Sequence, residues 1–116
     1  MWSERDASLI YEMHSALAQI EALIDREARD DFLADKAKPH ALAMFFVMLG
    51  EAASKVSPSC RARHPNIDWQ RIANLRHLIA HEYRRVDHAL LWGVATTDAP
   101  RLKLELPSPP PPETFA

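Results

Sequence analysis

The residues best suited to chemistry lie between Arg76 and Tyr83, in the run Arg-His-Leu-Ile-Ala-His-Glu-Tyr. A guanidinium can bind a phosphate as negative charge builds on it. An imidazole with a pKa of about 6.5 can deprotonate a ribose 2′-hydroxyl or protonate a leaving oxygen. Arg76 and His81 would supply these two groups without a metal. The products would be a 2′,3′-cyclic phosphate and a free 5′-hydroxyl, which requires RNA because DNA lacks the 2′-hydroxyl.

Arg76 and His81 do not point the same way if this run is helical. Five residues on an ideal helix correspond to a rotation of about 140° and a rise of about 7.5 Å. Either the helix loosens before His81, or the site pairs groups from two protomers across a two-fold axis. We therefore expect a homodimer with the site at the dimer cleft.

Each of these side chains also has a structural interpretation. Arg76 lies beside the apolar stripe of its helix, where an unpaired charge is costly, so it needs a carboxylate, a wet cleft or a subunit interface. The structural alternative is a pair with an Asp or Glu, such as those in the acidic first helix. His81 could be a capped or solvated histidine near a helix end, and Tyr83 could be a core residue unless a partner modifies it.

His77 and His81 are four residues apart and could share a helical face as two zinc ligands. A strong metal signal needs one or two further ligands at defined positions. His88 and the acidic residues show no such spacing. We therefore predict no metal and no cofactor.

Helices must position these residues, because apolar residues come in long windows and only two glycines, Gly50 and Gly93, are present. The fold class is all-α. The predicted elements are a helix from Ser3 to about Arg29, a second from Pro39 to about Val56, a third from Trp69 to between Tyr83 and Arg85, and a fourth that Asp87 caps and Pro100 interrupts. Asp68 is the predicted N-cap of the third helix, which carries the motif.

Several local features complete this prediction. Asp30 and Asp31 are expected to break the helical pattern, and residues 59–64 to form a short turn. The predicted inward residues of the second helix are Phe45, Leu49, Ala52 and Val56. Residues 1–106 form the predicted domain. Residues 107–116 form a proline-rich tail that we expect to be disordered, since its polyproline tendency cannot join a helical core.

Composition limits the classes of protein. The 116 residues fit one domain, and one cysteine excludes an internal disulfide framework and fits a reducing compartment. The net charge of −2 argues against binding nucleic acid by bulk charge, but residues 55–85 hold seven Lys/Arg against two Asp/Glu. That patch could receive a phosphate backbone or an acidic partner, or be a solvated face. With no export signal and no membrane-length apolar run, we expect a cytoplasmic protein.

From Arg76 to Tyr83 the sequence resembles the HEPN superfamily, and within it the HepT-like toxins. Their signature is an arginine, four residues, a histidine, one residue and a tyrosine, here Arg76, His81 and Tyr83. The resemblance covers about residues 5–106 and includes Leu49-Gly50-Glu51-Ala52-Ala53 and His64-Pro65-Asn66-Ile67-Asp68-Trp69. It implies a four- to five-helix up-and-down bundle, a homodimer with the motif at its cleft, and metal-independent ribonuclease activity.

The resemblance also implies a partner. In HepT-like systems the toxin is paired with an antitoxin encoded beside it, a minimal nucleotidyltransferase (MntA-like). The resemblance implies that such a partner attaches AMP from ATP to the motif tyrosine, here Tyr83. The residue after the motif arginine is most often asparagine in HepT-like sequences, whereas here it is His77. The proline-rich tail has no counterpart in the family pattern.

Two interpretations of function follow. In the first, the protein is an RNA endonuclease toxin of a toxin–antitoxin pair, with Arg76 and His81 catalytic, His77 as a supporting group and Tyr83 as the AMPylation site. In the second, it is a non-catalytic helical module that docks a minimal nucleotidyltransferase.

Overall fold

The structure, a computed structural model, describes residues 1–82 and 84–115 and is all-α over these residues, as predicted. The α-helices are α1 (Glu4–Ile24), α2 (Arg29–Ala34), α3 (Lys38–Lys55), α4 (Pro58–Arg63), α5 (Trp69–His81), α6 (His88–Gly93) and α7 (Ala99–Glu105). A π-helical turn, η1 (Val94–Asp98), joins α6 to α7, and a 3₁₀ turn, η2 (Pro112–Phe115), follows near the C-terminus.

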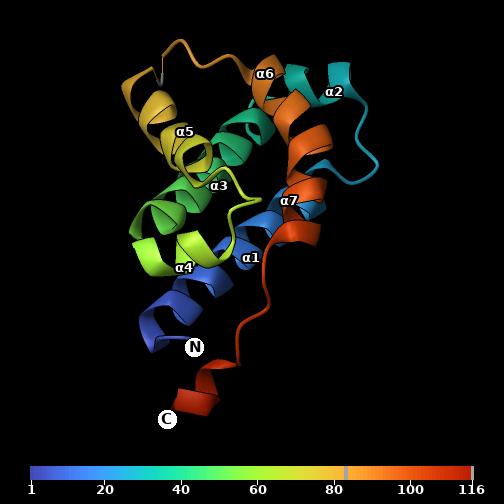
Figure 1. Cartoon of the computed structure of the whole chain (residues 1–116). Coiled ribbons are helices and arrows are strands. Elements are labelled where there is room, and N and C mark those ends of the chain that lie inside the picture. Colours follow the sequence, from blue (N-terminus) through green and yellow to red (C-terminus); the bar gives the residue numbers. More distant parts are fainter. Residues whose placement is uncertain (83, 116) are drawn as a thin grey trace.

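The helix α3 is the central element of the bundle. It packs against α1 and against α5, and these are the two most extensive helix contacts among the described residues. The helices α1 and α3 run antiparallel, as predicted, while α7 returns beside α1 and α6 lies near the start of α3 (Figure 1). The motif-bearing α5 is therefore held on one face of α3.

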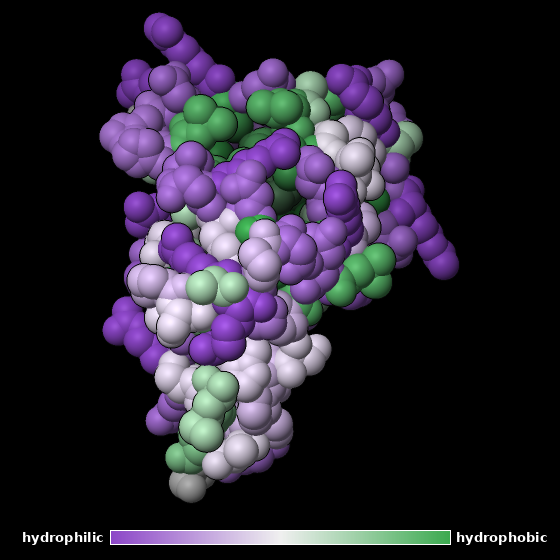
Figure 2. Space-filling model, viewed as in Figure 1, coloured by the Kyte–Doolittle hydropathy of each residue, from purple (hydrophilic) through white to green (hydrophobic). Residues whose placement is uncertain are grey.

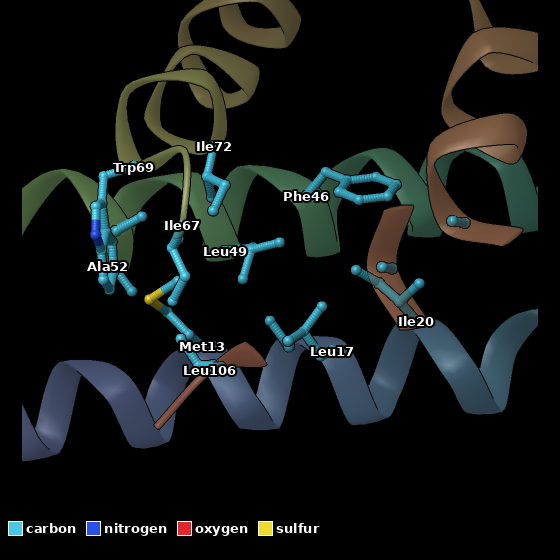
Figure 3. Close-up of a cluster of buried hydrophobic side chains, with 14 of the residues drawn as sticks. Met13, Leu17, Ile20, Phe46, Leu49, Ala52, Ile67, Trp69, Ile72 and Leu106 are labelled. Atoms are coloured by element: carbon cyan, nitrogen blue, oxygen red, sulfur yellow. The ribbon is translucent and has the colours of Figure 1, made fainter. Parts of the chain in front are cut away.

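The apolar faces of these helices meet in one core (Figure 3). The labelled side chains come from α1 (Met13, Leu17, Ile20), from α3 (Phe46, Leu49, Ala52), from α5 and the residues before it (Ile67, Trp69, Ile72), and from the residue after α7 (Leu106). The helix α5 is anchored to this core through Trp69, Ile72 and Ile79, each of which is buried.

Side-chain caps begin three helices where the sequence predicts them. The N–H groups of Asp6, Arg71 and Leu90 donate to the side-chain oxygens of Ser3 (3.0 Å), Asp68 (3.1 Å) and Asp87 (3.0 Å). Each of these bonds satisfies an amide that has no partner within its own helix. The predicted helix starts after Ser3, Asp68 and Asp87 are confirmed.

A buried carboxylate ties α1 to the start of α4. Asp6 is 4% exposed and accepts hydrogen bonds from the backbone N–H (2.9 Å) and the hydroxyl (2.6 Å) of Ser57. Burial acts to raise the pKa of Asp6, but the hydrogen bonds from Ser57 and Ser3 outweigh it and lower that pKa. Asp6 is therefore ionised and fully paired at neutral pH.

The first helix is shorter than predicted. It ends at Ile24 rather than near Arg29, and Arg26 adopts a left-handed conformation with φ of 60° that stops the helix. Asp30 and Asp31 do not break a helix. They lie in the first turn of α2, where carboxylates interact favourably with the exposed N–H groups of a helix.

Two further local predictions are wrong, and a third is confirmed only in part. Residues 59–64 are mostly helical, because Ser57 caps α4 and Pro58 occupies its first turn, where the missing N–H costs nothing. Of the predicted inward residues, Leu49, Ala52 and Val56 are buried, as predicted, whereas Phe45 packs only partly buried against the core and Phe46 is the fully buried phenylalanine of α3. The helix α5 ends at His81, with Glu82 as its C-cap, and so is shorter than predicted.

Pro100 interrupts the last long helix, as predicted. The backbone widens into the π-turn η1 before the proline, and the N–H of Ala99 donates to the carbonyl of Val94, five residues back. The hydroxyl of Thr96 donates to the carbonyl of Trp92 (2.9 Å). Pro100 then lies in the first turn of α7, where a proline fits a helix.

The prediction of a disordered C-terminal tail is not confirmed. Over its described part, the segment lies along α1: the hydroxyl of Tyr11 donates to the carbonyl of Pro109 (2.8 Å), and Nε2 of His14 bonds to the carbonyl of Pro107 (2.9 Å). Proline lacks an N–H but keeps its carbonyl, so α1 supplies the donors. None of the helices in the described part of the chain is both long and apolar enough to span a membrane.

Candidate active site

The position of α5 is set by its close approach to α3 at Gly50. A Cβ atom at Gly50 would lie 2.9 Å from each of Cβ of Arg76, N of Arg76 and O of Ile72. Real Cβ atoms do not approach other atoms so closely, so only glycine fits here without moving a helix. The tightest point of the α3–α5 contact therefore lies at the motif arginine.

Arg76 is paired with a carboxylate from α3. Its Nη1 atom lies 2.5 Å from Oε2 of Glu51, and Nζ of Lys55 lies 3.1 Å from Oε1 of the same residue. The hydrogen bond from Arg76, followed by that from Lys55, lowers the pKa of the Glu51 carboxyl. Glu51 is thus ionised at neutral pH and holds the guanidinium against α3.

The pair remains open to solvent. The side chains of Arg76 and Glu51 are 40% and 39% exposed. The expected carboxylate partner is present, but it comes from the Gly-Glu-Ala-Ala segment of α3 and not from the acidic first helix. A guanidinium has five N–H donors, and Glu51 is the side chain that the described structure pairs with it. Other donors of Arg76 therefore remain accessible to solvent.

The structure brings His77 and His81 together. Their ring centroids lie 4.2 Å apart with an interplanar angle of 59°, and both residues are exposed. His81 is the last residue of α5. No contact within residues 1–82 and 84–115 joins Arg76 to His81. The guanidinium contacts Glu51 of α3, while the two imidazoles contact each other at a tilt on the solvent side, in keeping with the helical geometry expected from the sequence.

The remaining motif residue, Tyr83, lies outside the described residues. The chain that follows it is basic, since Arg84 and Arg85 are both exposed. Together with Arg76, they place positive charge around the C-terminal end of α5. This arrangement suits a polyanionic substrate better than a neutral one.

An apolar groove opens on the other side of α5. It has a volume of about 530 Å³ and lies between α5 and the α6–η1–α7 segment. Figure 2 shows apolar side chains gathered in a hollow on this face. Its apolar lining includes Phe46, Leu49, Leu75, Leu78, Leu90 and Leu102. None of the described motif residues Arg76, His77 and His81 lines the groove.

Sequence reasoning gave Gly50 and Glu51 no role in the site. The available signal was a glycine inside a predicted helix, which indicates a close approach of two backbones, followed directly by a carboxylate. Among the described residues, no cluster of three or more histidine, cysteine, aspartate and glutamate side chains could hold a metal ion.

Comparison with known proteins points to one family of ribonucleases. Residues 13–108 match the family described as Ribonuclease HepT-like. The probable ribonuclease HepT of Thermococcus cleftensis is 32% identical over 76% of this chain and 80% of its own length. A candidate RNase of Methanocaldococcus jannaschii is 29% identical over 66% of this chain and 71% of its own length. No solved structure matches the chain.

Proposed function

Because the chain belongs to the family of HepT-like ribonucleases, we propose that it is a metal-independent RNA endonuclease in which Arg76 and His81 are the catalytic residues. The observation that carries this proposal is the placement of both residues on one helix, α5, with Arg76 half-exposed and His81 exposed. A substrate strand can therefore reach both groups without rearrangement of the bundle.

The reaction is an internal transfer at phosphorus. A neutral His81 imidazole accepts the proton of the 2′-hydroxyl, and the 2′-oxygen bonds to the adjacent phosphorus. The guanidinium of Arg76 binds the phosphate oxygens as charge builds on them. The bond from phosphorus to the 5′-oxygen breaks, and an imidazolium returns a proton to that oxygen. The products are a 2′,3′-cyclic phosphate and a 5′-hydroxyl.

We propose that two protomers form the complete site. Arg76 faces α3 while His81 faces solvent, so one chain does not direct both groups at one phosphate. A stripe of α3 beside the Arg76–Glu51 pair supports a subunit contact here, because Met44 and Met48 on it are 57% and 45% exposed. A two-fold axis near this stripe would supply His81 from each protomer, one as base and one as acid.

His77 has a supporting role in this proposal. Its ring contacts that of His81 at a tilt of 59° and limits the orientations that the catalytic imidazole can take. It also places a second potential phosphate donor one residue after Arg76. Both effects would align the phosphate and the base before reaction, which is the contribution that positioned groups make to catalysis.

The test of the activity is RNA cleavage by purified protein in EDTA. Wild type should cleave RNA to products with 2′,3′-cyclic phosphate ends, and His81→Ala should reduce the rate by about 100- to 10,000-fold, the usual contribution of a general acid or base. His64→Ala is the matched control, because His64 precedes α5 at the end opposite to His81 and its ring stacks on that of Trp2, with the ring centroids 6.0 Å apart. Equal rates for wild type and His81→Ala would exclude the catalytic proposal and favour a binding module.

We further propose that the protein is the toxin of a toxin–antitoxin pair and is silenced by AMPylation of Tyr83. The support is the family resemblance together with charge: AMP adds negative charge and bulk two residues after His81, beside the basic Arg84 and Arg85, and so would compete with an RNA phosphate. The proposed partner is a minimal nucleotidyltransferase (MntA-like) that uses ATP.

Intact-mass spectrometry tests the modification. After incubation with ATP and the proposed transferase encoded by the neighbouring gene, the wild type should gain AMP and lose ribonuclease activity. Tyr83→Phe should gain no AMP. The chain has two tyrosines, so Tyr11→Phe is the matched control and should still be modified. AMP added equally to Tyr83→Phe would disprove the assigned residue.

A further inference from the structure

The paired imidazoles of His77 and His81 form a feature that RNA cleavage does not account for fully. Both are exposed and on one face of α5, and their ring centroids are 4.2 Å apart. Within residues 1–82 and 84–115, the contact found for the two rings is the one between them, and no hydrogen bond engages their ring nitrogens. Each ring therefore keeps a lone pair available to an external ligand when it is neutral.

The spacing suits a shared metal ion. Two histidines at positions i and i+4 of a helix lie on one face and can bind one zinc ion together. A metal–nitrogen bond of about 2.0–2.1 Å places two such nitrogens about 3 Å apart around the ion. The ring centroids lie about 3.2 Å from an ion bound in this way, and hence about 5 Å from each other. The rings of His77 and His81, whose centroids are 4.2 Å apart, can reach this spacing by small χ rotations of two exposed side chains.

Local charge decides which ions can bind. His81 ends α5, where the free carbonyls give the helix a partial negative charge that favours a cation. Arg84 and Arg85 are close in sequence and oppose binding by charge alone. Hard ions such as Mg²⁺, which need carboxylate or phosphate oxygens, are therefore disfavoured. Ions that bind neutral imidazole, such as Zn²⁺, Ni²⁺ and Cu²⁺, are favoured.

We propose that His77 and His81 form an exchangeable transition-metal site whose occupation inhibits the ribonuclease. The ion takes the lone pair with which His81 would accept the 2′-hydroxyl proton, so a metal-bound protein cannot use this base. The ion is an inhibitor and not a cofactor. The metal-free protein, as obtained in EDTA, is the active form in this proposal. The binding part of this proposal stands alone, whereas the inhibition part rests on the proposed function.

Zinc titration tests binding without any assay of activity. Isothermal titration calorimetry with Zn²⁺ should show binding to the wild type, and Mg²⁺ in the same buffer should show none. His77→Asn, which introduces the residue most common in HepT-like sequences, should weaken Zn²⁺ binding at least about 10-fold, the minimum expected even for changes outside the first ligand shell. Unchanged Zn²⁺ affinity in His77→Asn would overturn the proposal.

A second histidine pair supplies the matched control. His40 and His88 have ring centroids 5.1 Å apart, and Nδ1 of His88 is buried without a hydrogen-bond partner in the described structure. Because these rings come from two different helices and one nitrogen is inaccessible, this pair should contribute little. His40→Asn should bind Zn²⁺ like wild type. If His40→Asn lost Zn²⁺ binding while His77→Asn kept it, the zinc site would involve His40 and the assignment to His77 and His81 would be refuted.

Inhibition is measured as the ratio of cleavage rates with and without Zn²⁺, taken separately for each variant. This ratio does not depend on the basal rate of the variant. Zn²⁺ should inhibit wild type over the concentration range in which it binds, EDTA should restore cleavage, and His77→Asn should need at least about 10-fold more Zn²⁺. A wild type that binds Zn²⁺ but never cleaves RNA would disprove the proposed function alone. A wild type that cleaves RNA at full rate with Zn²⁺ bound would disprove the inhibition.

Discussion

Replacing Gly50 with alanine should separate α3 from α5 and displace the motif arginine. The added methyl would meet Arg76 and Ile72 at 2.9 Å, and the atoms that it meets are two backbone atoms and a Cβ. None of these is the end of a flexible side chain. Since carbon atoms normally pack at about 3.5–4.0 Å, the two helices must move apart by roughly 0.5–1 Å.

Two opposing effects determine how much Gly50→Ala changes the free energy of unfolding. Overpacking at a tight helix contact costs about 1–3 kcal/mol. Alanine is favoured over glycine inside a helix by about 0.8–1 kcal/mol, which offsets part of that cost. Gly93→Ala isolates the second effect, because nothing lies within 4 Å of a Cβ atom at Gly93. The free energy of unfolding of Gly50→Ala should therefore lie about 1–3 kcal/mol below that of Gly93→Ala.

Thermal unfolding followed by far-ultraviolet circular dichroism gives this difference, at one fixed protein concentration because association would shift the midpoint. The Tm of Gly50→Ala should lie about 4–12 °C below that of Gly93→Ala. A shift of up to 1 Å at Arg76 should also lower the rate of RNA cleavage by up to about 100-fold, while Gly93→Ala keeps the wild-type rate. Equal Tm values for the two variants would refute the argument that α5 is seated on Gly50.

Three other predictions concern the scaffold. Asp6→Ala should destabilise the protein by about 1.5–3 kcal/mol at pH 7. Because the folded pKa of Asp6 lies below its unfolded value, urea titrations should show this difference shrinking as the pH falls below about 4, and a pH-independent difference would contradict the role of the ionised carboxylate. Burial raises the pKa of the Cys60 thiol, so a thiol reagent should modify it only at the rate of unfolding, and rapid labelling of folded protein would contradict its burial. Tyr11→Phe removes the hydrogen bond to Pro109 and should increase proteolysis of the C-terminal segment, with stability reduced by about 1 kcal/mol; unchanged proteolysis would show that this bond does not hold the segment.

Helix starts were predictable because their causes are local. Asp68 and Asp87 bind amides three residues away, so a few adjacent residues contain the whole signal. The buried face of α3 was harder to predict, since this helix packs against α1 and α5 together and buries more than one stripe. Phe45 and Phe46 both fit an apolar pattern, and only the positions of the neighbouring helices decide between them.

At the candidate site, the partner of Arg76 could not be predicted for the same reason. A charge beside an apolar stripe must be paired, and that much follows from the sequence alone. The choice of Glu51 depends on a contact 25 residues away, made possible by the missing side chain at Gly50. The docking of the tail on Tyr11 was equally inaccessible, because the acceptor is a backbone carbonyl that every residue has.

The pairing of Arg76 with Glu51 orients the guanidinium and does not block it. If the ion pair satisfied all the donors, an incoming phosphate would have to break it. Glu51 shares its two oxygens between Arg76 and Lys55, and the arginine side chain stays 40% exposed, so other donors face solvent. The surface position also keeps the pair weak, because water screens the attraction between the two charges, so a charged ligand can compete with it. The bundle thus fixes Arg76, the proposed phosphate-binding group, against α3 and leaves His81, the proposed proton carrier, on the solvent side, where a second chain would complete the proposed site.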